Sequence, residues 1–182
     1  MKRKTWLTAL LGALLGVATS AQAAPATPGI APEQQRRMDV MKSKGVDGSL
    51  TIVPIRVSGR PWNRVTEVAG LLLEKRGLKN IELAKTPFEP ADANIMADLS
   101  AAVGAVVRTN PAATDHALYA DYGFNPQNAE QGFVHFVVCD RKGEWVIVDL
   151  QNSHHTDYQS VGVDSRARCD HLLVKWLQGY LK

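Results

Sequence analysis

The most polar cluster of the chain runs from Asp149 to Asp157 and contains two adjacent histidines. Imidazole and carboxylate groups suit zinc and other first-row metals, so His154, His155 and Asp157 are candidate metal ligands, with Asp149 nearby. Adjacent histidines in an extended chain point to opposite faces, and the sequence has no His-Glu-x-x-His pattern. The alternative interpretation is a solvated loop with polar caps.

Three arginines surround the first predicted strand-to-helix connection. A helix N-terminus presents unpaired N–H groups, so Arg56, Arg60 and Arg64 form a candidate anion-binding site. The connection has no glycine-rich phosphate pattern. The alternative is a solvated rim beside a packed Trp62.

His135 lies inside an otherwise apolar predicted strand, and alternation puts it on the face of Val137 and Cys139. It is interpreted as a packing residue or, alternatively, as a base that lines a pocket. Asp121, at the end of the preceding strand, favours a turn or edge role. An acid–base pair would need proximity to a second carboxylate.

The two cysteines, Cys139 and Cys169, are predicted to form a disulfide, because an isolated pair in an exported chain is more often bonded than free. The alternative is two buried thiols that pack as small apolar groups. The sequence has no Cys-x-x-Cys pattern and no Gly-x-Ser-x-Gly elbow, which argues against thioredoxin-like redox chemistry and serine hydrolysis.

Residues 1–23 have the pattern of a secretory signal peptide: basic residues at 2–4, an apolar stretch at 6–17 and a small-x-small site ending at Ala23. Ala24 follows in place of a cysteine, and no later apolar run is long enough to span a bilayer. We therefore expect a periplasmic or secreted protein that is neither membrane-spanning nor a lipoprotein.

The formal net charge of +3 comes entirely from residues 2–4. The remaining chain has 18 basic and 18 acidic side chains, so it offers no surplus of cations for nucleic acid. No cofactor motif is present, and no cofactor is predicted.

These residues must be positioned by a single predicted α/β domain at 50–182, preceded by a flexible leader at 24–49 that has a possible short helix at 33–44. Hydrophobic periodicity predicts five strands at 50–56, 80–84, 116–122, 133–139 and 144–150, and three helices at 62–76, 90–108 and 164–181. Strand, helix and strand at the start form a βαβ unit, and the last three strands form an antiparallel meander. The predicted fold class is α/β (α+β): a two-layer sandwich with a mixed sheet of about five strands and helices mainly on one face.

The segments at 117–122 and 136–149 resemble parts of exported bacterial proteins of unknown function. The order of elements over residues 50–182 is similar to the amino-terminal domain of TolB and to CsgG-like domains of curli secretion. This resemblance implies a protein-interaction role in the cell envelope, and no functional residue is carried over from it.

Three functions follow as hypotheses. The leading one is a non-catalytic binding or envelope-assembly module whose partner is an envelope protein. The second is a small metal-dependent periplasmic hydrolase that uses the loop with His154, His155 and Asp157. The third is a carrier of a small ligand or anion at the arginine rim.

Overall fold

The computed structural model describes residues 30–85, 96–109, 114–123 and 132–181. The predicted signal peptide, the first residues of the predicted leader and the start of the helix predicted at 90–108 lie outside these ranges. The described helices are α1 (Pro32–Lys44), the short turn η1 (Gly45–Asp47), α2 (Asn63–Lys75), α3 (Met96–Thr109), α4 (Thr156–Val161) and α5 (Arg166–Leu181). The strands are β1 (Ser49–Ile52), β2 (Arg56–Val57), β3 (Arg60–Pro61), β4 (Asn80–Leu83), β5 (His116–Gly123), β6 (Phe133–Asp140) and β7 (Trp145–Asn152).

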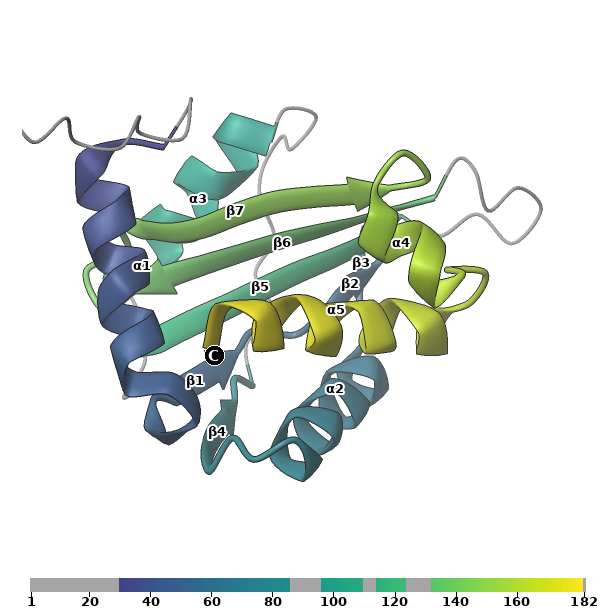
Figure 1. The fold of residues 1–182 in the computed structure, drawn as a ribbon, viewed down its shortest axis with the longest axis horizontal. Coiled ribbons are helices and arrows are strands. Elements are labelled where there is room, and N and C mark those ends of the chain that lie inside the picture. The colour runs from purple at the N-terminus through teal and green to yellow at the C-terminus, as the bar shows by residue number, and fades with distance from the viewer. Residues whose placement is uncertain (1–29, 86–95, 110–113, 124–131, 182) are drawn as a thin grey trace, which may run out of the picture.

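Strand β5 is the centre of one mixed sheet (Figure 1). On one side it pairs antiparallel with β6, which pairs antiparallel with β7. On its other side the short strands β1 and β2 follow one another, both parallel to β5, and β4 and β3 lie beyond them. The α/β class, the βαβ unit β1–α2–β4 and the meander β5–β6–β7 are confirmed.

The predicted strand at 50–56 is divided into β1 and β2 at Pro54, which has no N–H for the ladder. The first turn of α2 satisfies the backbone at this break. The Ile55 N–H donates to the Thr66 hydroxyl at 2.8 Å, and the Trp62 N–H donates to the Ile55 carbonyl at 2.8 Å. The division therefore ties α2 to the sheet without leaving these two backbone groups unpaired.

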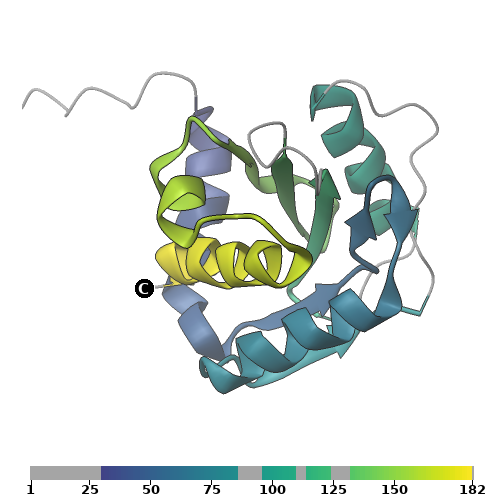
Figure 2. The same ribbon diagram turned by 90° about the vertical axis from the view of Figure 1, so that its right-hand side faces the viewer.

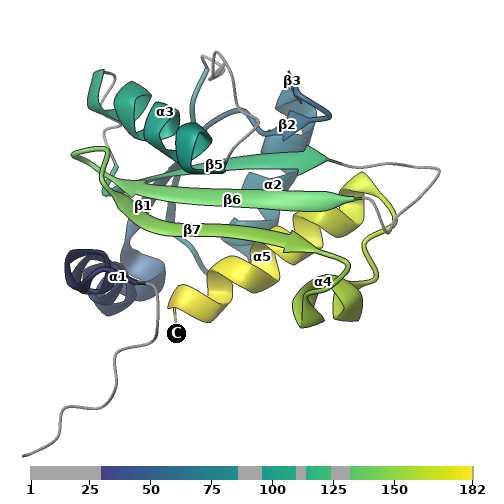
Figure 3. The ribbon, with the colours of Figure 1, turned by 90° about the horizontal axis from the view of Figure 1, so that it is seen from above.

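Helices cover both faces of the sheet, as Figures 2 and 3 show, with α3 on the opposite side from α1, α4 and α5. The larger core lies between α2, α5 and one face of the sheet, where Leu118, Tyr122 and Phe136 are fully buried. A smaller core joins Leu99 and Val103 of α3 to the other face. The predicted sandwich with its helices mainly on one face is confirmed. Among the described helices, α3 is the one on the other face, and α1 and α4 are additions to the three helices predicted.

The short helix expected at 33–44 is present as α1, and it is packed rather than loose. Met41 is 3% exposed within the larger core. The side chains of Gln34 and Arg37 donate hydrogen bonds to the carbonyls of Val146 and Trp145, at 3.4 and 2.6 Å. Helix α1 therefore covers the first part of β7, which has no strand neighbour on that edge. Among the described helices, none is both long and apolar enough to cross a membrane.

Candidate functional site

A groove with a volume of about 510 Å³ lies between the edge strand β7, α4 and the last turns of α5. We call it the α5 groove. It is lined by Asp149, Gln151, Asp157, Lys175, Trp176, Gln178, Gly179 and Tyr180. Strand alternation points the side chains at 149 and 151 to the face that α5 covers, which is why two polar residues of β7 reach this groove.

Asp149 is the best-supported polar group of the α5 groove. Its Oδ2 accepts hydrogen bonds from the indole N–H of Trp176 and from the amide of Gln151, both at 2.7 Å. Trp176 is fixed from behind because its ring stacks on Phe136 at 4.4 Å between centroids. The groove therefore has a rigid wall in which the carboxylate, the indole and the amide hold one another.

Gln151 leaves one hydrogen-bonding atom unused in this wall. Its side chain is 8% exposed, and its Oε1 is buried without a partner in the described part of the chain. A buried acceptor without a donor costs roughly 1–3 kcal/mol. At the rim, Asp157 pairs with Lys175 at 2.8 Å.

The open edge of β7 borders the α5 groove. Hydrogen bonds reach this edge at Val146, from α1, and at Asn152, whose N–H donates to His155 Nδ1 at 3.2 Å. Alternation gives Val148 and Leu150 the same outward direction as these two residues. In the described ranges, the hydrogen bonds to the β7 backbone from outside the sheet fall on Trp145, Val146 and Asn152, and none falls on Val148 or Leu150. About three residues of edge strand are thus available for pairing.

The predicted metal ligands are not brought together. His154 is exposed. His155 Nδ1 is hydrogen-bonded to Asn152 Oδ1 at 2.9 Å, and Asp157 forms an ion pair with Lys175. Within the residues that the structure describes, no three His, Cys, Asp or Glu side chains form a group that could hold a metal ion. The short helix α4 begins inside this predicted loop and separates Asp157 from the histidines.

The predicted disulfide is absent: Cys139 and Cys169 are both buried free thiols. Cys139 belongs to the smaller core under α3, whereas Cys169 belongs to the larger core on the other face. The sheet therefore lies between them. Burial raises the pKa of each thiol to about 12, which is typical of inert structural cysteines.

A second polar group lies on the face that α3 covers, beyond the residues that α3 contacts. Arg56 of β2, Asp121 of β5 and His135 of β6 are register partners on three neighbouring strands. We call these three residues the polar row. Register partners share one face of a sheet. The fold therefore brings Arg56, from the predicted arginine rim, next to Asp121 and His135, which the sequence alone leaves as two unrelated residues.

The turn between β2 and β3 positions two members of the polar row. Ser58 and Gly59 both have positive φ, at 50° and 78°, as a two-residue hairpin loop requires. The Gly59 carbonyl accepts a hydrogen bond from the Arg56 guanidinium, and its N–H donates to the Asp121 carboxyl. Tyr119 also hydrogen-bonds to Asp121. Arg60 and Arg64 are exposed and do not enter the row.

Three atoms of the polar row are buried without hydrogen-bond partners in the described part of the chain: Arg56 Nε, Asp121 Oδ1 and His135 Nε2. His135 is 4% exposed, and its burial lowers its pKa to about 4 against the opposing effect of Asp149. Burial raises the pKa of Asp121, and the Arg56 charge opposes this shift. At neutral pH the imidazole is therefore uncharged.

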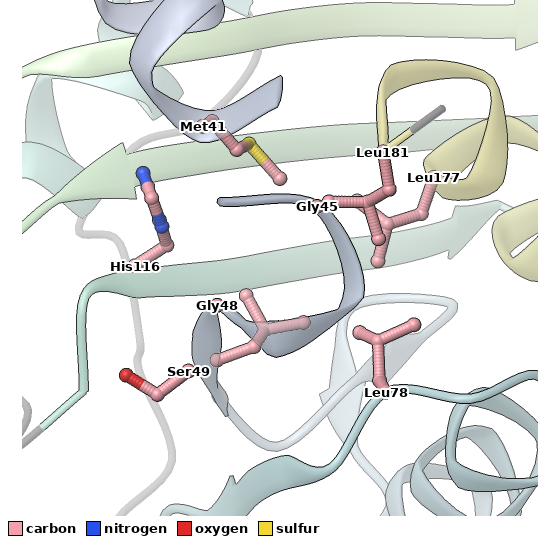
Figure 4. A pocket seen from close by; sticks show the side chains of 9 residues that line it. Met41, Gly45, Gly48, Ser49, Leu78, His116, Leu177 and Leu181 are labelled. Carbon is pink, nitrogen blue, oxygen red and sulfur yellow. The ribbon is translucent and has the colours of Figure 1, made fainter. Parts of the chain in front are cut away.

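A second cavity lies under α1 and is too small for a ligand. It is lined by Met41, Gly45, His116, Leu177 and their neighbours, and Figure 4 shows it between α1, the start of β1 and the end of α5. Its volume is about 10 Å³, which is room for about one water molecule. Burial lowers the pKa of the His116 side chain that borders it.

The fold and the α5 groove define a mixed α/β sandwich whose edge strand is half covered by a helix. No family model and no curated protein matches the chain. Among solved structures, the hypothetical protein CT253 from Chlamydia trachomatis aligns with 74% of this chain and 97% of its own, at 13% identity and a TM-score of 0.37. The lipoprotein GNA1162 from Neisseria meningitidis aligns with 69% and 96%, at 14% identity and a TM-score of 0.34. Scores this low carry no functional argument, and the resemblance to TolB and CsgG-like domains stays a prediction.

Proposed function

We propose that this chain is an exported, non-catalytic binding module of the cell envelope, which captures an extended segment of a partner protein on β7. The observation that carries the proposal is the juxtaposition of the open edge at Val148–Leu150 with the α5 groove. The signal-peptide pattern of residues 1–23 supports export.

Strand addition explains why the edge and the groove lie together. An added strand would hydrogen-bond to the outward backbone of Val148 and Leu150. Its alternate side chains would then point to the α5 side of the sheet, into the α5 groove. Backbone pairing supplies affinity and the groove supplies selectivity.

The groove favours a basic side chain on the captured segment. It offers the carboxylates of Asp149 and Asp157 against the single ammonium group of Lys175. The unpartnered Gln151 Oε1 is a further acceptor in the wall, and the Trp176 and Tyr180 rings, edge to face with 5.2 Å between their centroids, add apolar surface. Lys and Arg combine a long apolar stem with a donor group, which fits such a lining.

The test is photo-crosslinking in the periplasm from a benzophenone side chain at position 178, compared between two variants of one residue. Val148→Pro removes an outward N–H, whereas Val148→Ala keeps it and only shortens the side chain. We expect the yield of one defined partner adduct to fall about tenfold in Val148→Pro and to be retained in Val148→Ala. The mass of the adduct also shows whether the chain begins at Ala24.

Equal adduct yields in the two Val148 variants would exclude strand addition, provided that circular dichroism shows both variants folded. A benzophenone at Glu67, which is exposed on α2, is the control position. The same adduct from Glu67 would show that the crosslink does not report on the groove. A full-length chain that keeps residues 1–23 in the cytoplasm would overturn the export proposal.

A further inference from the structure

The polar row has the composition of a ligand site that is separate from the α5 groove. It lies on the opposite face of the sheet; Asp121 is near the carboxyl-terminal end of β5, and Arg56 belongs to the two-residue strand β2 that runs parallel beside that end. In α/β sheets, ligands bind beyond the carboxyl ends of parallel strands. The position and the polarity of the row thus agree.

The three unpartnered atoms differ in what they require from a ligand. Arg56 Nε–H is a cationic donor, which an anionic oxygen satisfies. Asp121 Oδ1 is a carboxyl oxygen, which an N–H donor satisfies. His135 Nε2 belongs to an uncharged ring, which can donate or accept according to its tautomer. Three such atoms side by side on one face need a partner that is both anionic and a donor.

The surroundings keep these atoms in place. Gly59 binds both Arg56 and Asp121, and the His135 ring packs edge-on against Tyr119 at 6.5 Å between centroids. Arg56 and Asp121 are only partly buried, so the row reaches the surface at that end. His135, at 4% exposure, forms the inner end.

We propose that the polar row binds a small zwitterion, such as an α-amino acid, with its carboxylate on Arg56 and its ammonium group on Asp121. His135 Nε2 then contacts the same ligand from the inner end. Neighbouring strands are about 4.8 Å apart, so adjacent members of the row match the short distance between the two charges of an amino acid.

The test uses glycine as the probe on the full mature protein, with acetate and methylammonium as its two separated halves. Nitrogen-detected NMR follows the His135 imidazole and the Arg56 Nε during each titration. We expect a saturable shift with glycine, and an affinity about tenfold weaker for each half. Saturation should also fix one tautomer of His135.

Two variants and two controls make the result specific. Arg56→Lys keeps the positive charge but lacks Nε–H, and His135→Phe keeps the ring shape; each should weaken glycine binding about tenfold. Arg60→Ala, which removes an exposed arginine outside the row, should leave it unchanged. Val148→Pro should also leave it unchanged, so failure here is distinct from failure of strand capture.

Two results would overturn the proposal. The first is the absence of any saturable shift at His135 with all three probes, which would assign the unpartnered atoms to ordered water alone. The second is equal affinity for acetate and glycine, which would make the row a simple anion site.

Discussion

Strand β5 has one tyrosine on each face that hydrogen-bonds to a carboxyl group. The two pairs differ in how completely their surroundings satisfy their hydrogen-bonding atoms. On the α5 side, the Tyr122 hydroxyl donates to Asp170 Oδ1 at 2.9 Å, and both residues are buried in the larger core. On the α3 side, Tyr119 and Asp121 stand beside Arg56 and His135, and three atoms of that group have no partner in the described part of the chain.

The comparison distinguishes buried polar groups that only stabilise the fold from buried polar groups that can still form hydrogen bonds with a ligand. A closed pair such as Tyr122–Asp170 contributes to folding, and neither side chain has a buried hydrogen-bonding atom without a partner in the described residues. A group with unpartnered atoms is stable only because the rest of the fold offsets its cost. Buried polar residues therefore indicate a site only when their hydrogen-bond capacity is unfilled.

The largest expected effect is on the pH dependence of stability. Burial raises the pKa of Asp170 from 3.8 to about 7, although its Tyr122 hydrogen bond opposes the shift. Between these values the folded protein holds a proton that the unfolded chain has lost, so this residue makes the free energy of unfolding fall as pH rises, by about 1.4 kcal/mol per pH unit. Urea unfolding of the wild type and Asp170→Asn from pH 4 to pH 8 should show the wild type losing stability relative to the variant up to about pH 7.

His135, on the other face of the sheet, should change the pH dependence of stability in the opposite direction and serves as the control. The pKa of His135 is lowered from 6.5 to about 4, so in this window the unfolded chain holds the extra proton and stability rises with pH. Relative to His135→Phe, the wild type should therefore gain stability between about pH 4 and pH 6.5. The same sign of slope for both residues would contradict the comparison.

The next effect is the loss of one hydroxyl in the closed pair. Tyr122→Phe leaves the Asp170 carboxyl without its donor at 3% exposure, and we expect the free energy of unfolding at pH 7 to fall by about 1–3 kcal/mol. Tyr180→Phe, on the half-buried tyrosine at the α5 groove, is the matched control and should cost less. Equal losses would mean that the buried pair is no more tightly coupled than a surface hydroxyl.

The smallest effects concern the two thiols. Cys139→Ala and Cys169→Ala should each cost about 1 kcal/mol, and the double variant should equal their sum to within about 0.5 kcal/mol, because the sheet separates the two sites. The native mass should contain no two-proton deficit. A double variant that loses no more than one single variant would indicate that the cysteines act as a bonded pair.

The sequence predicts which segments form helices and strands better than it predicts which face of the sheet each helix covers. Local periodicity is enough for the βαβ unit and the meander, and Pro54 correctly marks an irregular strand. The choice of face depends on contacts between distant residues. Alternation places Cys139 with His135, but nothing in the sequence assigns α3 to that face and α5 to the other. The predicted disulfide failed for this reason.

The candidate sites were predicted in part. Asp149 and Asp157 belong to a cluster whose composition indicates a functional region, yet the groove they line depends on Trp176 and Lys175 of α5. The polar row requires the register of β5 with β6, in which Asp121 lies opposite His135. Asp170 was missed because it follows a cysteine on the apolar face of a helix, where a carboxyl is not expected.

The contact between α1 and β7 closes a long loop of the chain, since Arg37 and Trp145 are 108 residues apart. A loop of this length forms late in folding, because non-local contacts must wait for the chain that joins them. The edge of β7 and the helix that shields it can therefore meet only after the intervening strands β1 and β4–β6 have been made, so this edge is the last part of the sheet to be covered.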